Sequence, residues 1–244
     1  MSHRPFRICL VTALWLRETL ERLVLGYYSQ LKLDGIELIL VAVGSEGRSS
    51  MERAMDNGWH YVEAENDPLS DKWNHGIAAA ALHDPDAVVV LGSDDLLNEQ
   101  YFYSVLDEYK DGPGVIQLAD AYFHDVETGE TVYIERAYPG AGTFISAEIL
   151  RRMGWRLWRS GKNRYLDKEM SEYVRREAYP FEWRTIRDCE SRGIVLVDIK
   201  TQINMWTLDD NKRITDNRHV HVDGPDLFSK HFPTVYGKLK SLTS

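Results

Sequence analysis

The chain has 244 residues, of which 43% are hydrophobic and 27% charged, as in an ordinary soluble globular protein and unlike a disordered or fibrous one. Its 38 acidic residues outnumber its 29 basic residues, and the net charge of −9 argues against broad binding to a nucleic-acid backbone. The two cysteines form no disulfide framework, and no apolar stretch approaches the roughly 20 residues that cross a bilayer. We therefore expect a soluble, cytoplasmic protein with no membrane span.

The first half of the chain alternates predicted strands with predicted helices. Apolar runs predict strands over residues 7–13, 36–43 and 60–64. Helical periodicity and turn residues predict helices over residues 16–31, 50–57 and 72–82. Because the connections are short, the expected fold class is α/β, with a Rossmann-like, mostly parallel central sheet flanked by helices.

Residues 86–97 are the most informative stretch of the sequence. The apolar run from Ala87 to Leu91 predicts a strand buried on both faces, and Asp94 and Asp95 follow it directly after Gly92 and Ser93. Ligands bind at the carboxyl ends of such strands, and two adjacent carboxylates repel each other unless a cation compensates them. The pair therefore predicts Mn²⁺ or Mg²⁺ bound together with a phosphorylated ligand. The alternative is that these residues cap a helix expected over residues 98–109.

The pattern changes after residue 112. Two expected strands, over residues 115–124 and 131–136, flank a turn at residues 127–130 and predict a β-hairpin. Helices are expected to follow the N-cap Ser146 and to begin at Asp167, and a late strand is expected over residues 193–200. We divide the chain into residues 1–112, residues 113–203 and a tail of residues 204–244, which we expect to pack near the site.

Four motifs occur in an order that resembles a known family. They are Asn74-His75-Gly76-Ile77-Ala78, the strand that ends in Asp94-Asp95, the loop over residues 140–146, and Leu166-Asp167-Lys168-Glu169. Together, over roughly residues 6–177, they resemble the GT-A glycosyltransferases of family 2. The resemblance implies a GT-A type fold, with a nucleotide-sugar-binding half at residues 1–112 and a smaller acceptor-binding half of β-hairpin and helices at residues 113–203.

The resemblance also implies roles for individual residues. Asp95 would bind the metal that bridges the diphosphate of the donor, and Asp94 would lie beside the ribose or in the second coordination shell of the metal. Asp167 would be the general base that deprotonates the acceptor hydroxyl, with Glu169 as the substitute and helix capping as the alternative role for Asp167. The other implied nucleotide-sugar residues are Thr12, Ala13, Lys72 and Asn74, and the implied acceptor-side residues are Gly142 and Thr143.

The sequence departs from the family pattern at two places. Family members carry acids just before the Gly-Ser of the second-strand loop, one of which contacts uracil, whereas Ala42 and Val43 occupy those positions here. Glu46 is the nearest acid and becomes the candidate nucleotide-sugar residue in this loop. Gly92 replaces the first member of the fuller acidic motif, which leaves fewer acids for the ribose and the metal.

The tail offers two histidines as further metal ligands. His219 and His221 are two residues apart and would face the same side of a strand. Many GT-A enzymes bring a C-terminal histidine to the metal, while the alternative is that both are exposed surface histidines. The tryptophans and arginines of residues 151–187 fit either a sugar-stacking platform or ordinary packing.

We therefore hypothesise a metal-dependent glycosyltransferase. It would move a sugar from a nucleotide-diphosphate sugar, UDP-linked by the resemblance, to an acceptor hydroxyl with inversion. The acceptor would be a glycan, a small molecule or a modified nucleic acid. The alternatives are a nucleotidyltransferase, which usually has a glycine-rich loop that residues 12–15 lack, and a non-catalytic module that binds nucleotide sugars or glycans.

Overall fold

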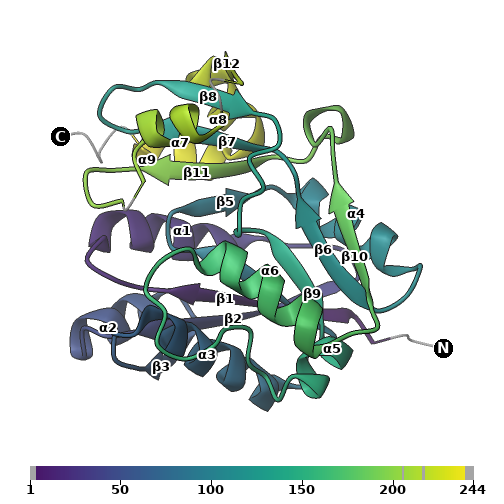
Figure 1. Ribbon diagram of the computed structural model, residues 1–244. Helices are drawn as coiled ribbons and strands as arrows, with labels where there is room; N and C mark the ends of the chain where they lie inside the picture. The colour runs from purple at the N-terminus through teal and green to yellow at the C-terminus, as the bar shows by residue number, and fades with distance from the viewer. Residues whose placement is uncertain (1–3, 205, 216–217, 240–244) are drawn as a thin grey trace.

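The computed structural model describes residues 4–204, 206–215 and 218–239, which form two β-sheets with helices packed on them (Figure 1). The strands of the larger sheet are β1 (Phe6–Ala13), β2 (Ile36–Gly44), β3 (His60–Glu63), β4 (Ala87–Gly92), β6 (Gly114–Leu118), β9 (Thr143–Ser146) and β10 (Glu182–Ile186). Their order is β10-β6-β9-β4-β1-β2-β3, and only β9 runs antiparallel to its neighbours. The predicted α/β class with a mostly parallel central sheet is confirmed.

The smaller sheet has the order β12-β8-β7-β11-β5 and lies above the larger one in Figure 1. Its strands are β5 (Asp95–Leu97), β7 (Ala121–Asp125), β8 (Thr131–Ile134), β11 (Leu196–Lys200) and β12 (His219–His221). The helices are α1 (Glu18–Gln30), α2 (Arg48–Asp56), α3 (Leu69–Ala80), α4 (Glu99–Tyr109), α5 (Ala147–Arg152), α6 (Leu166–Glu177), α7 (Leu208–Ile214), α8 (Gly224–His231) and α9 (Pro233–Leu239), with 3-10 turns at Ala81–His83 and Glu190–Arg192.

Strand β4 is buried on both faces, as its sequence predicts. Ala87, Val89 and Leu91 belong to one hydrophobic cluster. Val88 and Val90 belong to a second cluster on the opposite face of the sheet. The strand is therefore fixed from both sides, and its carboxyl end holds the following residues in a defined position.

The single strand predicted over residues 115–124 is wrong, because the structure has two strands there. The chain leaves the larger sheet after β6 and enters the smaller sheet at β7, so the run forms two strands. The carboxylate of Asp120, between them, accepts hydrogen bonds from the backbone N–H groups of Arg136 (3.0 Å) and Cys189 (3.2 Å). The predicted hairpin is confirmed, because β7 and β8 pair antiparallel around a turn with Gly129 at a φ of 73°.

The C-terminal tail packs in two separate parts of the molecule. Helix α7 lies on the same face of the molecule as α6, while α8 and α9 pack behind the smaller sheet (Figure 1). The ring of Phe232 meets the ring of Tyr27 on α1 with centroids 5.5 Å apart. Residues 205, 216–217 and 240–244 of the predicted tail lie outside the described residues. Within the described ranges, no helix is long and apolar enough to cross a bilayer.

Acid is expected to destabilise the fold through His124. Its Nδ1 lies 2.8 Å from the hydroxyl of Thr131, its ring packs on Phe228, and burial lowers its pKa from 6.5 to about 4. The unfolded chain therefore binds a proton here at a higher pH than the folded chain, so this group removes stability as the pH falls from 6.5 to about 4. We expect His124→Gln to reduce the loss of unfolding free energy between about pH 7 and pH 5 by about 1–2 kcal/mol in urea titrations. Equal losses in the two proteins would contradict this role.

Candidate active site

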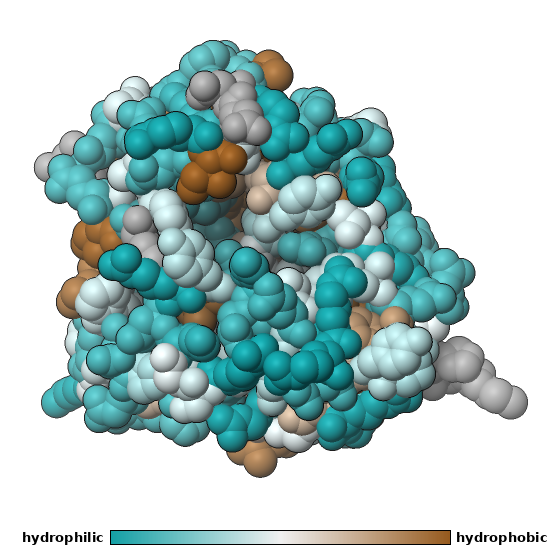
Figure 2. Space-filling view, in the orientation of Figure 1, coloured by the Kyte–Doolittle hydropathy of each residue, from teal (hydrophilic) through white to brown (hydrophobic). Residues whose placement is uncertain are grey.

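Three adjoining pockets form a cleft at the carboxyl ends of β1 and β4. Their volumes are about 570, 430 and 310 Å³, and we number them first, second and third in that order. The first and second pockets share Arg17, Leu69, Asn163, Arg164 and Asn204. The second and third share Asp94, Leu166, Asp167, Lys200 and Trp206. Figure 2 shows the face of the molecule hollowed between α7 and α6. A larger cavity, of about 690 Å³, lies elsewhere, and none of the predicted site residues lines it.

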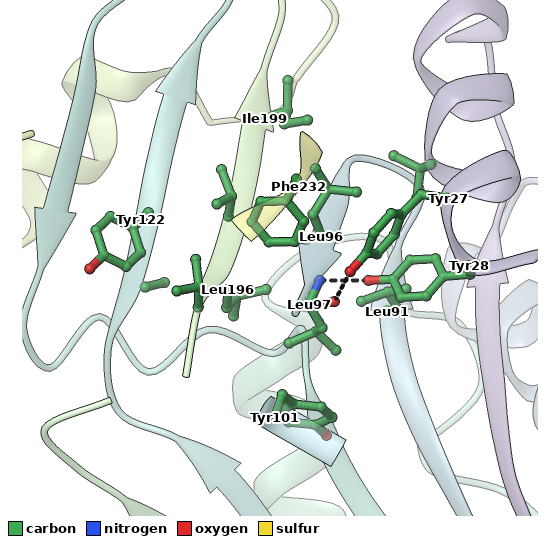
Figure 3. Packing of buried hydrophobic residues seen from close by; sticks show 14 of the residues in the cluster. Tyr27, Tyr28, Leu91, Leu96, Leu97, Tyr101, Tyr122, Leu196, Ile199 and Phe232 are labelled. Atoms are coloured by element: carbon green, nitrogen blue, oxygen red, sulfur yellow. Dashed lines mark hydrogen bonds between the residues drawn. The ribbon is translucent and has the colours of Figure 1, made fainter. Parts of the chain in front are cut away.

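Two tyrosines of α1 hold the short segment that contains Asp95, and Figure 3 shows their hydroxyls against Leu97. The hydroxyl of Tyr28 donates to the carbonyl of Asp95 at 3.2 Å and accepts from the N–H of Leu97 at 2.7 Å. The hydroxyl of Tyr27 donates to the carbonyl of Leu97 at 2.9 Å. These bonds fix residues 95–97 as the short strand β5. The cap of α4 is Asn98, whose side chain accepts from Tyr101 N–H, so the alternative of capping by residues 93–95 is wrong.

Gly92 makes room for both carboxylates. A Cβ atom at this position would lie 2.4 Å from Oδ2 of Asp95 and 2.7 Å from Oδ1 of Asp94. Its backbone N–H instead donates to Oδ2 of Asp95 at 2.7 Å. Gly92 therefore replaces an acid of the family motif, and its backbone N–H contacts the carboxylate of Asp95 directly.

Asp94 is neutralised within the chain. Its carboxylate pairs with the guanidinium of Arg17 and accepts a 2.6 Å hydrogen bond from the amide of Asn204. Arg17 also donates to the hydroxyl of Ser93 at 3.0 Å. Burial acts to raise the pKa of Asp94, but Arg17, Lys200 and Asn204 outweigh burial and hold that pKa below its ordinary value. Asp94 is therefore an anion that fixes Arg17 and Asn204 at the border of the first and second pockets.

A third carboxylate, that of Asp198 on β11, faces Asp95. The two residues are directly opposite in the antiparallel pair of β5 and β11, so their side chains lie on the same face. Burial, reinforced by the charges of Asp94 and Asp198, raises the pKa of Asp95 well above its ordinary value. The ammonium of Lys200 lies 2.6 Å from Oδ2 of Asp198, while Oδ1 is buried without a hydrogen-bond partner in the described part of the chain.

These carboxylates fit a divalent cation. The described residues contain no group of three or more His, Cys, Asp or Glu side chains placed to hold a metal ion. However, Mg²⁺ usually takes only one or two protein carboxylates, and waters and substrate phosphates complete its shell. The partnerless oxygen of Asp198, on the face of the sheet that also carries Asp95, is available as a ligand for such a cation.

The predicted histidine ligands lie elsewhere. His219 and His221 do face the same side of β12, with ring centroids 5.3 Å apart. However, β12 is the edge strand of the smaller sheet opposite β5, which carries Asp95. Four strand spacings of about 4.8 Å separate the two edges. His221 contacts Glu130 at 3.1 Å, so the structure does not bring these histidines to the carboxylates.

The first pocket has Lys72 at its base. The ammonium donates to the carbonyl of Leu14 (2.6 Å), the hydroxyl of Ser45 (2.9 Å) and the amide oxygen of Asn66 (2.9 Å). Burial lowers the pKa of Lys72 to about 8. Because three acceptors use its three protons, Lys72 joins the ends of β1 and β2 to the residues that precede α3.

The other predicted nucleotide residues differ in position. Ala13 lines the first pocket, whereas Thr12 is fully buried within β1. Asn74 is also buried and binds the 157–158 loop, donating to Trp158 O at 2.8 Å and accepting from Leu157 N–H at 3.0 Å. Asn74 therefore fixes the chain that leads to α6 rather than facing the nucleotide pocket.

Glu46 belongs to a buried ion network beneath the cleft. Arg53, which is 1% exposed, pairs with Glu46 and with Glu21, the latter at 2.7 Å. Glu21 accepts from the N–H of Trp15 at 2.6 Å, and Glu46 accepts from the N–H of Leu16 at 3.3 Å. The network therefore holds the loop that precedes Arg17, in which Leu16 has a φ of 57°.

Arg53→Met is expected to lower the free energy of unfolding by about 3–5 kcal/mol, because it leaves the charge of the fully buried Glu21 without its partner. Urea unfolding would measure the loss. Arg48→Met is the matched control, since Arg48 forms only an exposed ion pair on the same helix. A loss no larger than that of the control would contradict the structural role of the network.

Asp167 lines both the second and the third pocket, at the start of α6. Burial, reinforced by Asp198, raises its pKa. It packs so closely on Gly140 that a Cβ atom there would lie 1.8 Å from the Asp167 carboxylate. The substitute candidate, Glu169, pairs with Arg159 at 3.0 Å. Of the two candidate bases, only Asp167 lines the described pockets.

The acceptor-side glycine and threonine lie beneath the third pocket. Gly142, with a φ of 72°, donates to Val90 O at 2.9 Å and accepts from the hydroxyl of Tyr101 at 2.8 Å. The hydroxyl of Thr143 donates to Gly140 O at 2.7 Å. Their neighbours Gly140 and Ala141 line the pocket instead.

Several polar residues of the cleft do not follow from the sequence motifs, among them Arg17, Asp198, Lys200 and Asn204. Asp198 and Lys200 alternate with apolar residues in a predicted strand, so they share one face. Two charged residues on one face of a mostly buried strand are unusual. This pattern could have identified Asp198 and Lys200 as site residues from the sequence. Arg17 and Asn204 lie in loops and carry no such signal.

No protein-family model matches the chain, and no curated protein matches it by sequence. Among solved structures, the chain is similar to residues 1–349 of S. aureus TarS, with a TM-score of 0.54 and 10% identity, over 75% of this chain and 58% of that one. For TarS in complex with UDP, the TM-score is 0.58 and the identity 8%, over 98% of this chain and 70% of that one. The chain thus spans little more than half of the first of these structures. It has a GT-A-like glycosyltransferase fold.

Proposed function

We propose that the protein is a metal-dependent, inverting glycosyltransferase that moves a sugar from a UDP-sugar to an acceptor hydroxyl. The observation that carries the proposal is one continuous cleft lined by the carboxylates of Asp95, Asp198 and Asp167. The likeness to GT-A structures, one of them a UDP complex, supports it at the level of the fold.

The first pocket would hold the nucleoside. Trp15, which is 45% exposed at this pocket, offers an aromatic face to the base. The amide of Asn66 offers an N–H donor, because its oxygen already accepts from Lys72. Arg164 lines the first and second pockets and has no ion-pair partner among the described residues, so it would contact the diphosphate.

Asp95 and Asp198 would hold Mn²⁺ or Mg²⁺ against the diphosphate. The bound cation would stabilise the negative charge of the leaving UDP. Asp167 would take the proton of the acceptor hydroxyl as the oxygen bonds to the anomeric carbon and the bond from that carbon to the phosphate oxygen breaks. By the resemblance to family 2, the attack would come from the face opposite UDP and invert the anomeric centre.

Thermal unfolding with UDP and UDP-sugars, each with and without Mn²⁺, tests the proposal. UDP with Mn²⁺ at about 100 times its dissociation constant should stabilise the protein by ~2.7 kcal/mol, and EDTA should remove most of this gain. Release of UDP from a UDP-sugar, lost in the presence of EDTA, would separate an enzyme from a binding module. The absence of stabilisation by UDP, with or without metal, would contradict the proposal.

A further inference from the structure

A second cavity lies outside the cleft and has no part in the proposed function. Its volume is about 690 Å³, within the range of roughly 300–1,000 Å³ that is usual for small-molecule sites. The end of α1, the start of α4, the 3-10 turn at Glu190–Arg192 and the junction of α8 with α9 surround it. We call it the α1–α4 cavity.

Hydrogen bonds hold the inner wall of the α1–α4 cavity in place. Tyr27, on α1, donates to the carbonyl of Leu97 at 2.9 Å. Asn98, the cap of α4, donates to the carbonyl of Gly193 at 2.8 Å and accepts from the N–H of Val195 at 3.0 Å. Both Tyr27 and Asn98 line the cavity and are buried. The cavity is therefore formed by the fold itself, as ligand sites usually are.

Positive side chains predominate in the lining of the α1–α4 cavity. Lys32, Arg192 and Lys230 line it, together with one acid, Glu99. Arg192 pairs at 2.9 Å with Glu108, which is not a lining residue. Lys32 and Lys230 have no ion-pair partner among the residues that the structure describes. Because the whole chain has a net charge of −9, this excess of positive charge is local and suits an anion.

The uncharged part of the lining suits an organic ligand. Leu31, Tyr103 and Pro233 offer apolar surface. Gln30 and His231 offer polar groups, and burial lowers the pKa of His231, which keeps its ring uncharged at neutral pH. A phosphate monoester carries nearly two negative charges and three acceptor oxygens, so two free ammonium groups attract it more strongly than a carboxylate. An extended polyanion is disfavoured, because the acidic remainder of the chain repels it.

We propose that the α1–α4 cavity binds a small molecule that carries a phosphate monoester. Lys32 and Lys230 bind the phosphate, and the uncharged part of the ligand packs against Tyr103 and Pro233. The inference does not rest on the proposed function, because none of the predicted site residues lines this cavity.

Calorimetry with paired sugars tests the inference. The probes are glucose 6-phosphate and ribose 5-phosphate, with glucose and ribose as their uncharged counterparts. EDTA is present throughout, so that no metal in the cleft contributes to binding. We expect at least one sugar phosphate to bind at least about tenfold more tightly than its sugar. Equal binding within both pairs, or a dissociation constant above about 1 mM for both phosphates, would overturn the inference.

Charge variants assign the binding to the α1–α4 cavity. Lys32→Gln and Lys230→Gln should each weaken binding of the sugar phosphate by about threefold to tenfold, whereas Glu99→Gln should strengthen it by about twofold to threefold. Arg164→Gln is the matched control, since Arg164 lines the first and second pockets instead, and it should leave this binding unchanged. Unchanged binding in both lysine variants, or an equal loss in Arg164→Gln, would overturn the inference.

Discussion

Asp95→Asn is expected to lower kcat/KM for sugar transfer by about 10²–10³-fold without lowering the melting temperature. The variant loses the carboxylate that would hold the metal and the diphosphate. Asparagine can still accept the hydrogen bond from Gly92 N–H, and it removes a negative charge that lies against Asp94 and Asp198. Steady-state kinetics and thermal unfolding would measure the two effects.

The matched control for this variant is Asp111→Asn, at an exposed position away from the cleft. It should leave both activity and melting temperature unchanged. Full activity of Asp95→Asn would contradict the assignment of Asp95. A large fall in its melting temperature would show instead that the carboxylate serves the fold.

Asp167→Asn is expected to lower kcat by about 10²–10⁴-fold and to leave the affinity for UDP unchanged, because a general base acts on the acceptor and not on the nucleotide. Glu169→Gln is the matched comparison two residues further along α6, where the ion pair with Arg159 already occupies the carboxylate. Single-turnover transfer and UDP titration would separate the two quantities. If Glu169→Gln loses transfer and Asp167→Asn retains it, the base is Glu169.

The sequence was most informative where local pattern and burial coincide. The five apolar residues of β4 alternate between two hydrophobic clusters, so their run could belong only to a strand covered on both faces. The start of α6 was predicted at Asp167, one residue after its actual start at Leu166, because acids favour the first turn of a helix. In both places the residues that decide the structure are close together in the chain.

The rest of the site depends on distant partners. Leu96 and Leu97 fit the start of a helix as well as a strand, and the choice is made by Tyr28 on α1 and by pairing with β11. Lys72 lines the first pocket, but the three acceptors that use its protons come from separate segments. The position of His219 depends on the order of strands in the smaller sheet, which no local pattern encodes.

The pairing of β5 with β11 has a consequence for synthesis of the chain. A ribosome makes β5 long before β11, and domains begin to fold from the N-terminal side as the chain emerges. Asp95 therefore has neither its paired strand nor the neighbouring charges of Asp198 and Lys200 while the first half of the chain is being made. The cleft is completed only when the segment around residues 196–204 has emerged, so a nascent chain that already contains the whole nucleotide half is expected to be inactive.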